Sequence, residues 1–145
     1  GGALHHPSKV EAHRTMRLAS SGSAEVWARQ IAPLLFGRQY IEAYPDRIQS
    51  LARWRARYPV DPVGLARQWE AFDGFDMGDQ LSQIGCPVLV VHGDDDALSP
   101  LANATALATG LPDAELLVLE GIGHSPNVEC ASAFNGAIET FIDRP

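Results

Sequence analysis

Two side chains in the second half of the chain, Asp96 and His124, could carry out acid–base chemistry together. A carboxylate that holds one nitrogen of an imidazole leaves the other nitrogen free to accept a proton, which makes the histidine a general base. The two residues are far apart in sequence, so their pairing depends on the elements between them.

The residues between and around this pair predict a strand, a helix and a second strand. Residues 88–91 form an unbroken Val and Leu run, which is typical of a strand buried on both faces. Ser99 then fits a helix N-cap with Pro100 at the first helical position, and Gly110 fits the C-cap. Residues 114–119 predict the second strand, and His124 follows shortly after it.

A strand–helix–strand unit of this length most simply forms a right-handed parallel crossover. The carboxyl ends of two parallel strands meet at one edge of the sheet, where open α/β sheets carry their chemistry. Asp96 and His124 each follow one of these strands. We therefore expect the carboxylate and the imidazole to meet at this edge.

The motifs around the pair resemble those of a known family. They read Pro87-Val-Leu-Val-Val-His-Gly-Asp-Asp-Asp96 and Gly121-Ile-Gly-His124-Ser-Pro126-Asn-Val-Glu129. In this order and spacing they resemble the C-terminal part of an α/β-hydrolase. The resemblance implies a partial α/β-hydrolase fold in two parts: a helical cap over residues 1–76, then a parallel β-α-β-α unit of the core over residues 77–145.

The resemblance also implies roles for the two residues. Asp96 would be the acid and His124 the base of a Ser-His-Asp triad that hydrolyses a small-molecule ester or lactone through a serine acyl-enzyme. No cofactor or metal is implied. Esterase, lactonase, C–C hydrolase and perhydrolase variants are not separated by these motifs.

The nucleophile of such a triad is unknown in this chain. The family places its serine in a Gly-x-Ser-x-Gly elbow that precedes the acid and the base. No serine here has glycine at both flanking positions, and Ser23, which follows Gly22, has Glu25 two residues later. The chain resembles a cap plus the last two strands, so we expect no triad-type turnover from it alone. The alternative is a non-catalytic remnant that binds a ligand or partner through its cap.

The first half predicts short helices interrupted by Pro and Gly, with no convincing strand. All three tryptophans lie in this half. The helices are expected at residues 8–19, 24–35 with a break at Pro33, 45–58, and 61–72 with Asp61 as N-cap. By resemblance they would form a lid over the substrate pocket.

The tail predicts one more helix, over residues 129–142, with a buried apolar stripe that lies against the strands. The stripe consists of Cys130, Phe134, Ala137, Ile138 and Phe141. The strand at 88–91 would still lack a neighbour on one side. We expect an N-terminal segment outside this chain, or a second copy of the chain, to cover it, unless the chain is a cleaved piece, in which case the strand stays uncovered.

Several other side chains have ordinary structural interpretations. Asp94 and Asp95 are expected to be solvated turn residues, because three consecutive aspartates lack the regular ligand spacing of a cation site. His92 is expected to pack or to hydrogen-bond nearby, and Cys86 to pack in the core instead of acting as a nucleophile. The arginines at 47–57 predict a solvated helix face, and His5, His6 and His13 a loop without metal.

Composition limits the class of protein. The chain has 145 residues, 46% hydrophobic and 20% charged, with a net charge of −7. These values indicate a globular protein and make nucleic acid an unexpected partner. Two cysteines do not build a disulfide framework, which favours a reducing, cytoplasmic location. No apolar run reaches the roughly 18 residues of a membrane span, and no signal peptide is visible.

Overall fold

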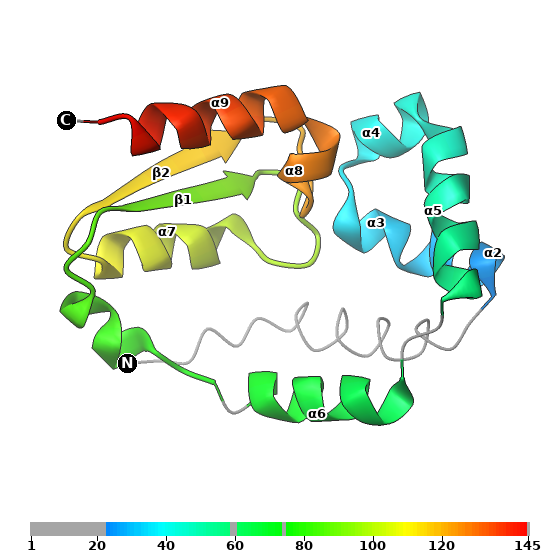
Figure 1. Cartoon of the computed structure of the whole chain (residues 1–145), viewed down its shortest axis with the longest axis horizontal. Coiled ribbons are helices and arrows are strands. Elements are labelled where there is room, and N and C mark those ends of the chain that lie inside the picture. The colour runs from blue at the N-terminus through cyan, green and yellow to red at the C-terminus, as the bar shows by residue number, and fades with distance from the viewer. Residues whose placement is uncertain (1–22, 59–60, 74, 145) are drawn as a thin grey trace.

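The computed structural model describes residues 23–58, 61–73 and 75–144. The helix predicted over residues 8–19 and the three histidines near the N-terminus, His5, His6 and His13, lie outside the described residues. Within the described residues, helices come first and a small parallel sheet follows, as Figure 1 shows.

The first half of the described chain is helical, in agreement with the sequence pattern. Its elements are α2 (Ala24–Gln30), α3 (Ala32–Leu35), α4 (Arg38–Ala43), α5 (Pro45–Arg57), α6 (Pro62–Asp73) and the 3₁₀ helix η1 (Gly78–Gln83). The helices predicted at 45–58 and 61–72 are confirmed, and the one at 24–35 is divided into α2 and α3. Neither α4 nor η1 was predicted, since both are short and carry little apolar periodicity.

Local capping explains where these helices begin. Ser23 accepts a hydrogen bond from the amide of Val26 at the start of α2. Asp61 accepts from the amides of Val63 and Gly64 at 3.3 and 2.9 Å, so its predicted role at the start of α6 is confirmed. Pro45 occupies the first turn of α5, where its missing N–H costs nothing.

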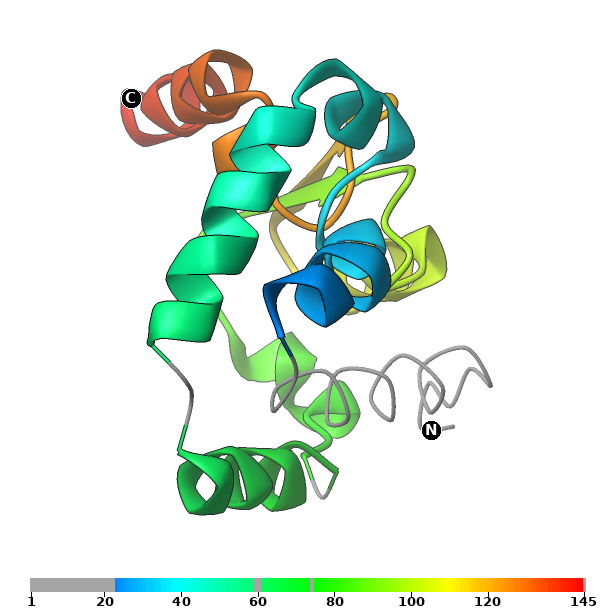
Figure 2. The same ribbon diagram turned by 90° about the vertical axis from the view of Figure 1, so that its right-hand side faces the viewer.

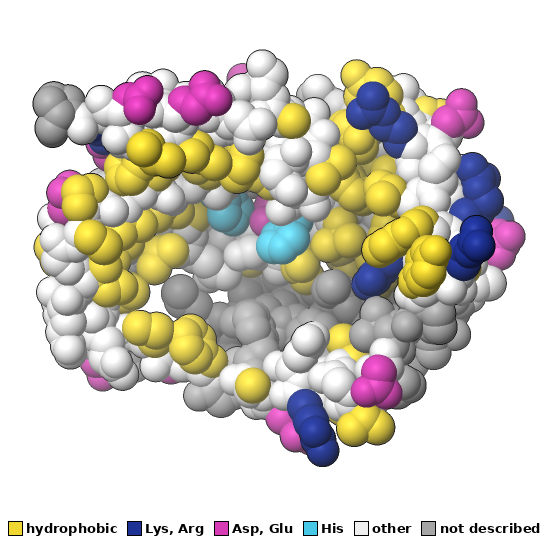
Figure 3. Space-filling view, in the orientation of Figure 1, with side chains coloured by type: hydrophobic (Ala, Val, Ile, Leu, Met, Phe, Trp, Pro, Cys, Tyr) yellow, Lys and Arg dark blue, Asp and Glu magenta, His cyan; other side chains and the backbone are white. Residues whose placement is uncertain are grey.

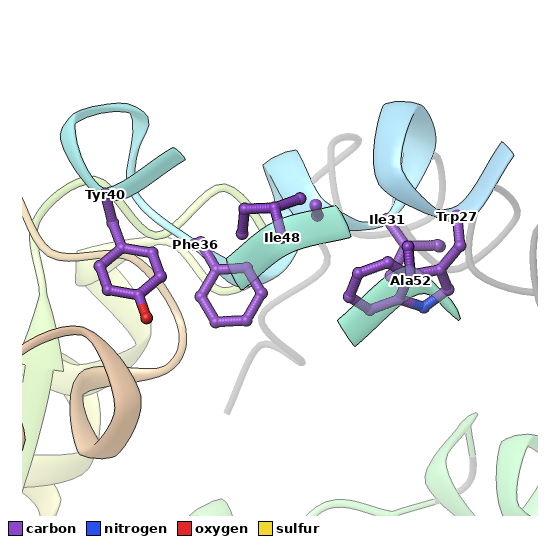
Figure 4. Packing of buried hydrophobic residues seen from close by; sticks show 7 residues of the cluster. Trp27, Ile31, Phe36, Tyr40, Ile48 and Ala52 are labelled. Carbon is purple, nitrogen blue, oxygen red and sulfur yellow. The ribbon is translucent and has the colours of Figure 1, made fainter. Parts of the chain in front are cut away.

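Helices α2 to α5 share one apolar core, which we call the helical cluster. Its buried residues are Trp27, Ile31, Ala32, Phe36, Tyr40, Ile48 and Ala52 (Figure 4). The rings of Phe36 and Tyr40 stack with their centroids 5.5 Å apart. Ala52 has no exposed surface, so the small side chain lets α5 approach α2 closely.

The second half contains the predicted parallel crossover. β1 (Val88–Gly93) and β2 (Ala114–Leu119) pair in parallel, with Val88 opposite Ala114 and Gly93 opposite Leu119. α7 (Leu101–Gly110) connects them, and its Ala104 packs with Val90 and Leu111 in a second core cluster. Both strand predictions and their parallel direction are therefore confirmed.

Two helix boundaries differ from the sequence prediction. α7 begins at Leu101 with Pro100 as its cap residue, because Pro100 is extended (ψ 144°). Ser99 is therefore not the N-cap, and its amide instead donates to Asp96. Gly110 is the last helical residue and not the C-cap.

The tail forms two helices instead of one, α8 (Pro126–Glu129) and α9 (Ala131–Ile142). Cys130 separates them with φ −138° and ψ 50°, which is not helical. No residue of α9 is fully buried, so the predicted buried stripe is only half-buried. The reason is that α9 covers a sheet of only two strands in the described residues.

Cys86 also differs from its prediction, because it is exposed and not in the core. It lies in a bend before β1, and strand pairing begins only at Val88. Cys130 is half-buried, and burial raises the pKa of its thiol.

The layers place one edge of the sheet next to the helical cluster. α9 and α7 lie on opposite faces of the two strands, and the strands point toward α3 and α4 (Figure 1). The view turned by 90° shows the loops after the strands beside the blue and cyan helices (Figure 2). The sheet edge that carries the candidate chemistry therefore faces the helical half.

Candidate functional site

Asp96 and His124 meet at the carboxyl edge of the two strands. His124 Nδ1 lies 2.8 Å from Asp96 Oδ2, which is hydrogen-bonding distance. The Asp96 side chain is 4% exposed and the His124 side chain 41% exposed, so the acid is buried while the imidazole reaches the surface. Figure 3 shows histidine side chains in cyan toward the middle of this face.

The carboxylate of Asp96 is oriented by its own loop. Its Oδ1 accepts hydrogen bonds from the amides of Leu98 and Ser99, both at 2.8 Å. These two donors occupy Oδ1, so Oδ2 is directed to His124. The turn after β1 therefore orients the Asp96 carboxylate independently of His124.

The pair changes the pKa of both members. Burial raises the pKa of Asp96, but the hydrogen bond to His124, the amides of Ser99 and Leu98 and the charge of His124 outweigh it, leaving the pKa below 3.8. The hydrogen bond to Asp96 raises the pKa of His124 above 6.5, against burial, and the charges of Asp96 and Glu129 add to this rise. The acid is therefore ionised at neutral pH, and its charge favours the protonated imidazole.

A second imidazole lies beside the same carboxylate. His92 Nδ1 is 2.7 Å from the carbonyl oxygen of Gly93, so Nδ1 donates and carries the proton. Its Nε2 is buried without a hydrogen-bond partner and lies 3.6 Å from Asp96 Oδ2, which is too far for a hydrogen bond. The expectation that His92 bonds nearby is confirmed for one of its two nitrogens.

Three acidic side chains around the pair make contacts that sequence reasoning missed. Asp94 Oδ1 accepts from the amide of Gly121 at 2.6 Å, and Asp95 Oδ2 accepts from the amide of Arg38 at 2.8 Å. Both are turn residues as predicted, with Asp94 exposed and Asp95 partly exposed, but each also accepts a hydrogen bond that the prediction did not include. The sequence signal for these two hydrogen bonds was the run of consecutive aspartates directly after a strand, since a carboxylate at that position can reach the neighbouring loop.

The third missed residue is Glu129, at the end of α8. Its carboxylate accepts from the amides of Gly37, Gly123 and Ser125. Glu129 belongs to the same motif as His124, five residues further on, but the sequence alone does not identify its partners.

Close backbone contact joins the helical half to the loop of His124. A Cβ added to Gly37 would lie 2.6 Å from the carbonyl oxygen of Gly121, and one added to Gly123 would collide with Gly37 and Phe36. Gly121 has φ +68°, a left-handed conformation that favours glycine. These glycines therefore permit an approach that a side chain would prevent.

The arrangement can move a proton. With Nδ1 bonded to Asp96, His124 Nε2 is the nitrogen that can accept one, and no described residue hydrogen-bonds to it. The part of the chain that the structure describes contains no group of three His, Cys, Asp or Glu side chains placed to hold a metal ion. None of the helices in this part is long and apolar enough to cross a membrane.

Sequence comparisons identify proteins that this chain is similar to. The family model described as TAP-like protein matches residues 69–145, just over half of the chain. A protein of Pseudomonas syringae named "Putative carbamate hydrolase RutD" is 31% identical over 138 residues, which cover 94% of this chain and 52% of that protein. An Escherichia coli O127:H6 protein of the same name is 26% identical, over 84% of this chain and 46% of its own length. The chain thus spans about half the length of these curated relatives.

Solved structures share the fold. An α/β-hydrolase from a Medee basin deep-sea metagenome library superposes with a TM-score of 0.80 at 18% identity, over 97% of this chain and 52% of that one. The enol-lactonase of Burkholderia xenovorans LB400 gives a TM-score of 0.73 at 25% identity, over 95% of this chain and 49% of that one. The predicted resemblance is confirmed, and the chain belongs to the TAP-like α/β-hydrolases.

Proposed function

We propose that this chain supplies the acid and the base of a serine hydrolase that cleaves an ester or lactone. The observation that carries the proposal is the 2.8 Å contact between His124 Nδ1 and Asp96 Oδ2, formed by loops that follow two adjacent parallel strands. Family membership supports hydrolysis in general.

In the proposed reaction, His124 Nε2 accepts the proton of a serine hydroxyl while that oxygen bonds to the substrate carbonyl carbon. The protonated imidazole then gives its proton to the leaving oxygen, and water releases the acyl group by the same two proton transfers. Asp96 holds the ring in the required orientation and stabilises its charged form.

Carbamates are a related substrate class to test, because the curated relatives carry that name. An ester, a lactone and a carbamate all present a carbonyl with a heteroatom leaving group, so one acid and base pair can serve all three. The helical half lies at the edge of the sheet that bears the pair. We propose that it is a cap, with the division near residue 76, that covers the substrate and excludes water.

The serine and the rest of the sheet would come from polypeptide equivalent to the remaining half of the relatives. Beside β1, an open apolar groove of about 420 Å³ is lined by Leu89, Val91, Phe134, Ile138, Phe141 and Ile142. Hydrophobic side chains gather below α9 on the face shown in Figure 3. We propose that this groove and the free edge of β1 receive that half, which buries apolar surface and pairs the strand.

The test joins the remaining half of the Pseudomonas syringae relative to this chain and measures hydrolysis of p-nitrophenyl acetate, a lactone and an aryl carbamate. We expect turnover by the chimera and none above background by the chain alone. His124→Ala should reduce kcat about 10⁶-fold, as removal of the histidine from a serine triad does. Asn127→Ala, an exposed neighbour on α8, serves as the matched control and should have no effect.

The outcomes separate the two functions considered. Turnover by a folded chimera that does not depend on His124 would reject the base role. Robust turnover by the chain alone that His124→Ala abolishes would show that its nucleophile lies within these 145 residues. A folded chimera with no turnover would favour the non-catalytic binding module.

A further inference from the structure

We propose that Glu129 is a positioning residue that holds the imidazole of His124 in place and links it to the helical half. The importance of this role for catalysis rests on the proposed function, whereas the contacts themselves do not. Glu129 touches no reacting atom and acts through the backbone on either side of the base.

On the side of the base, Glu129 binds both neighbours of His124. The amide of Gly123 donates to both carboxylate oxygens at 3.1 Å, and the amide of Ser125 donates to Oε1 at 3.3 Å. His124 lies between these two donors. Its backbone is therefore fixed from both sides, and the ring can meet Asp96 without a search over loop conformations.

On the helical side, Glu129 binds the turn that starts α4. The amide of Gly37 donates to Glu129 Oε2 at 2.8 Å. Gly37 is the N-cap of α4 and has no side chain to cap the helix itself. A carboxylate at this position satisfies a free N–H and is favoured by the helix dipole.

The same turn is held from the loop of the acid. Asp95 accepts from the amide of Arg38, the next residue, at 2.8 Å. Two successive amides of one turn are thus bound by carboxylates from the loop that carries Asp96 and from α8, the helix that follows His124. Phe36, directly before this turn, packs in the helical cluster. This turn therefore connects the helical cluster to the segments on either side of His124.

The negative charge of Glu129 is needed for this role. Three N–H groups converge on its two oxygens, and a carboxylate accepts at both. The amide of a glutamine offers one oxygen and would present its own N–H groups to donors. The charge also contributes to the raised pKa of His124, after the hydrogen bond and charge of Asp96.

The experiment compares Glu129→Gln with Glu139→Gln in the full chain by NMR. Glu139 is exposed on α9, so its substitution removes the same charge without these contacts. We expect Glu129→Gln to lower the pKa of His124 and to speed amide exchange at Gly37 and Gly123 roughly tenfold or more. Glu139→Gln should change neither. Equal behaviour of the two variants would overturn the proposal.

A measurement on the unmodified chain covers the case in which Glu129→Gln does not fold. NMR should detect scalar couplings across the hydrogen bonds from the amides of Gly37 and Gly123 to the Glu129 carboxyl carbon, because both amides donate to this carboxylate. Slow-exchanging amides at Gly37 and Gly123 without such couplings would overturn the proposal. Neither readout uses turnover, so an inactive chimera would reject the proposed function and leave this inference standing.

Discussion

At the scale of residues, three consecutive aspartates have three different tasks. Asp94 binds the amide of Gly121, Asp95 binds the amide of Arg38, and Asp96 binds His124. Each carboxylate reaches a different neighbour because the chain turns after β1. Identical side chains thus differ in role only through the direction in which the loop points them.

Asp96→Asn should lower the pKa of His124 toward its ordinary value. The substitution removes the charge that favours the imidazolium and weakens the hydrogen bond to Nδ1. NMR titration of the imidazole checks this, with Asp113→Asn, an exposed loop residue, as control. An unchanged pKa of His124 in Asp96→Asn would show that the two side chains do not interact in solution.

The pair should also make the free energy of unfolding depend on pH, through Asp96 at low pH and through His124 at higher pH. The pKa of Asp96 is lowered from 3.8, so its contribution is present above that value and is lost as pH falls through the folded-state pKa. The pKa of His124 is raised from 6.5, so its contribution is complete below 6.5 and is lost as pH rises through the folded-state pKa.

Urea unfolding of the chain and of Asp96→Asn across this pH range measures the effect. The difference in unfolding free energy should be largest between these two titrations and should shrink on either side. A difference independent of pH would contradict the assignment of both shifts to this pair.

At the scale of elements, the site depends on how closely the two loops approach. A Cβ on Gly93, at the end of β1, would collide with the carbonyl oxygen of Ile122 and lie 2.5 Å from that of Gly123. Backbone atoms cannot move aside as a flexible side chain can. The absence of a side chain at Gly93 therefore allows the end of β1 to lie this close to the loop of His124.

Gly93→Ala should destabilise the chain by about 1–3 kcal/mol, as overpacking does, and should separate the loops. Gly136→Ala is the matched control, because nothing lies within 4 Å of its Cβ position in α9. In a helix this change should stabilise by about 0.4–1 kcal/mol. Urea unfolding compares the two, and equal effects would contradict the close approach.

At the scale of the whole molecule, β1 has one paired edge and one free edge among the described residues. The amides of Val88 and Asp94 donate to Asp113 and Leu119, on the side of β2. Because amides alternate along a strand, those of Leu89 and Val91 face the other edge. The apolar groove lies on the same strand.

The amides of Leu89 and Val91 should therefore exchange quickly in the chain alone and roughly a hundredfold more slowly in the chimera. The added half would supply a strand that accepts their hydrogen bonds. Hydrogen exchange measures this, with Val90 as the internal control, since its amide faces β2. Unchanged exchange at Leu89 and Val91 in a folded chimera would reject this docking edge.

Much of this molecule was predictable from local patterns. The Val and Leu run gave β1, the spacing gave a parallel crossover, and the order of motifs placed Asp96 and His124 at one edge. These features depend on residue type and short-range periodicity, which a sequence displays directly. The division between cap and core at residue 76 stays a prediction.

Only the tertiary structure decided what holds the pair in place. The contacts of Asp95 and Glu129 with Arg38 and Gly37 join residues 57 and 92 positions apart. No local pattern encodes such a contact, because it exists only when the helical cluster packs against the loops. Sequence determined which side chains could react, whereas packing determined which backbone amides restrain them.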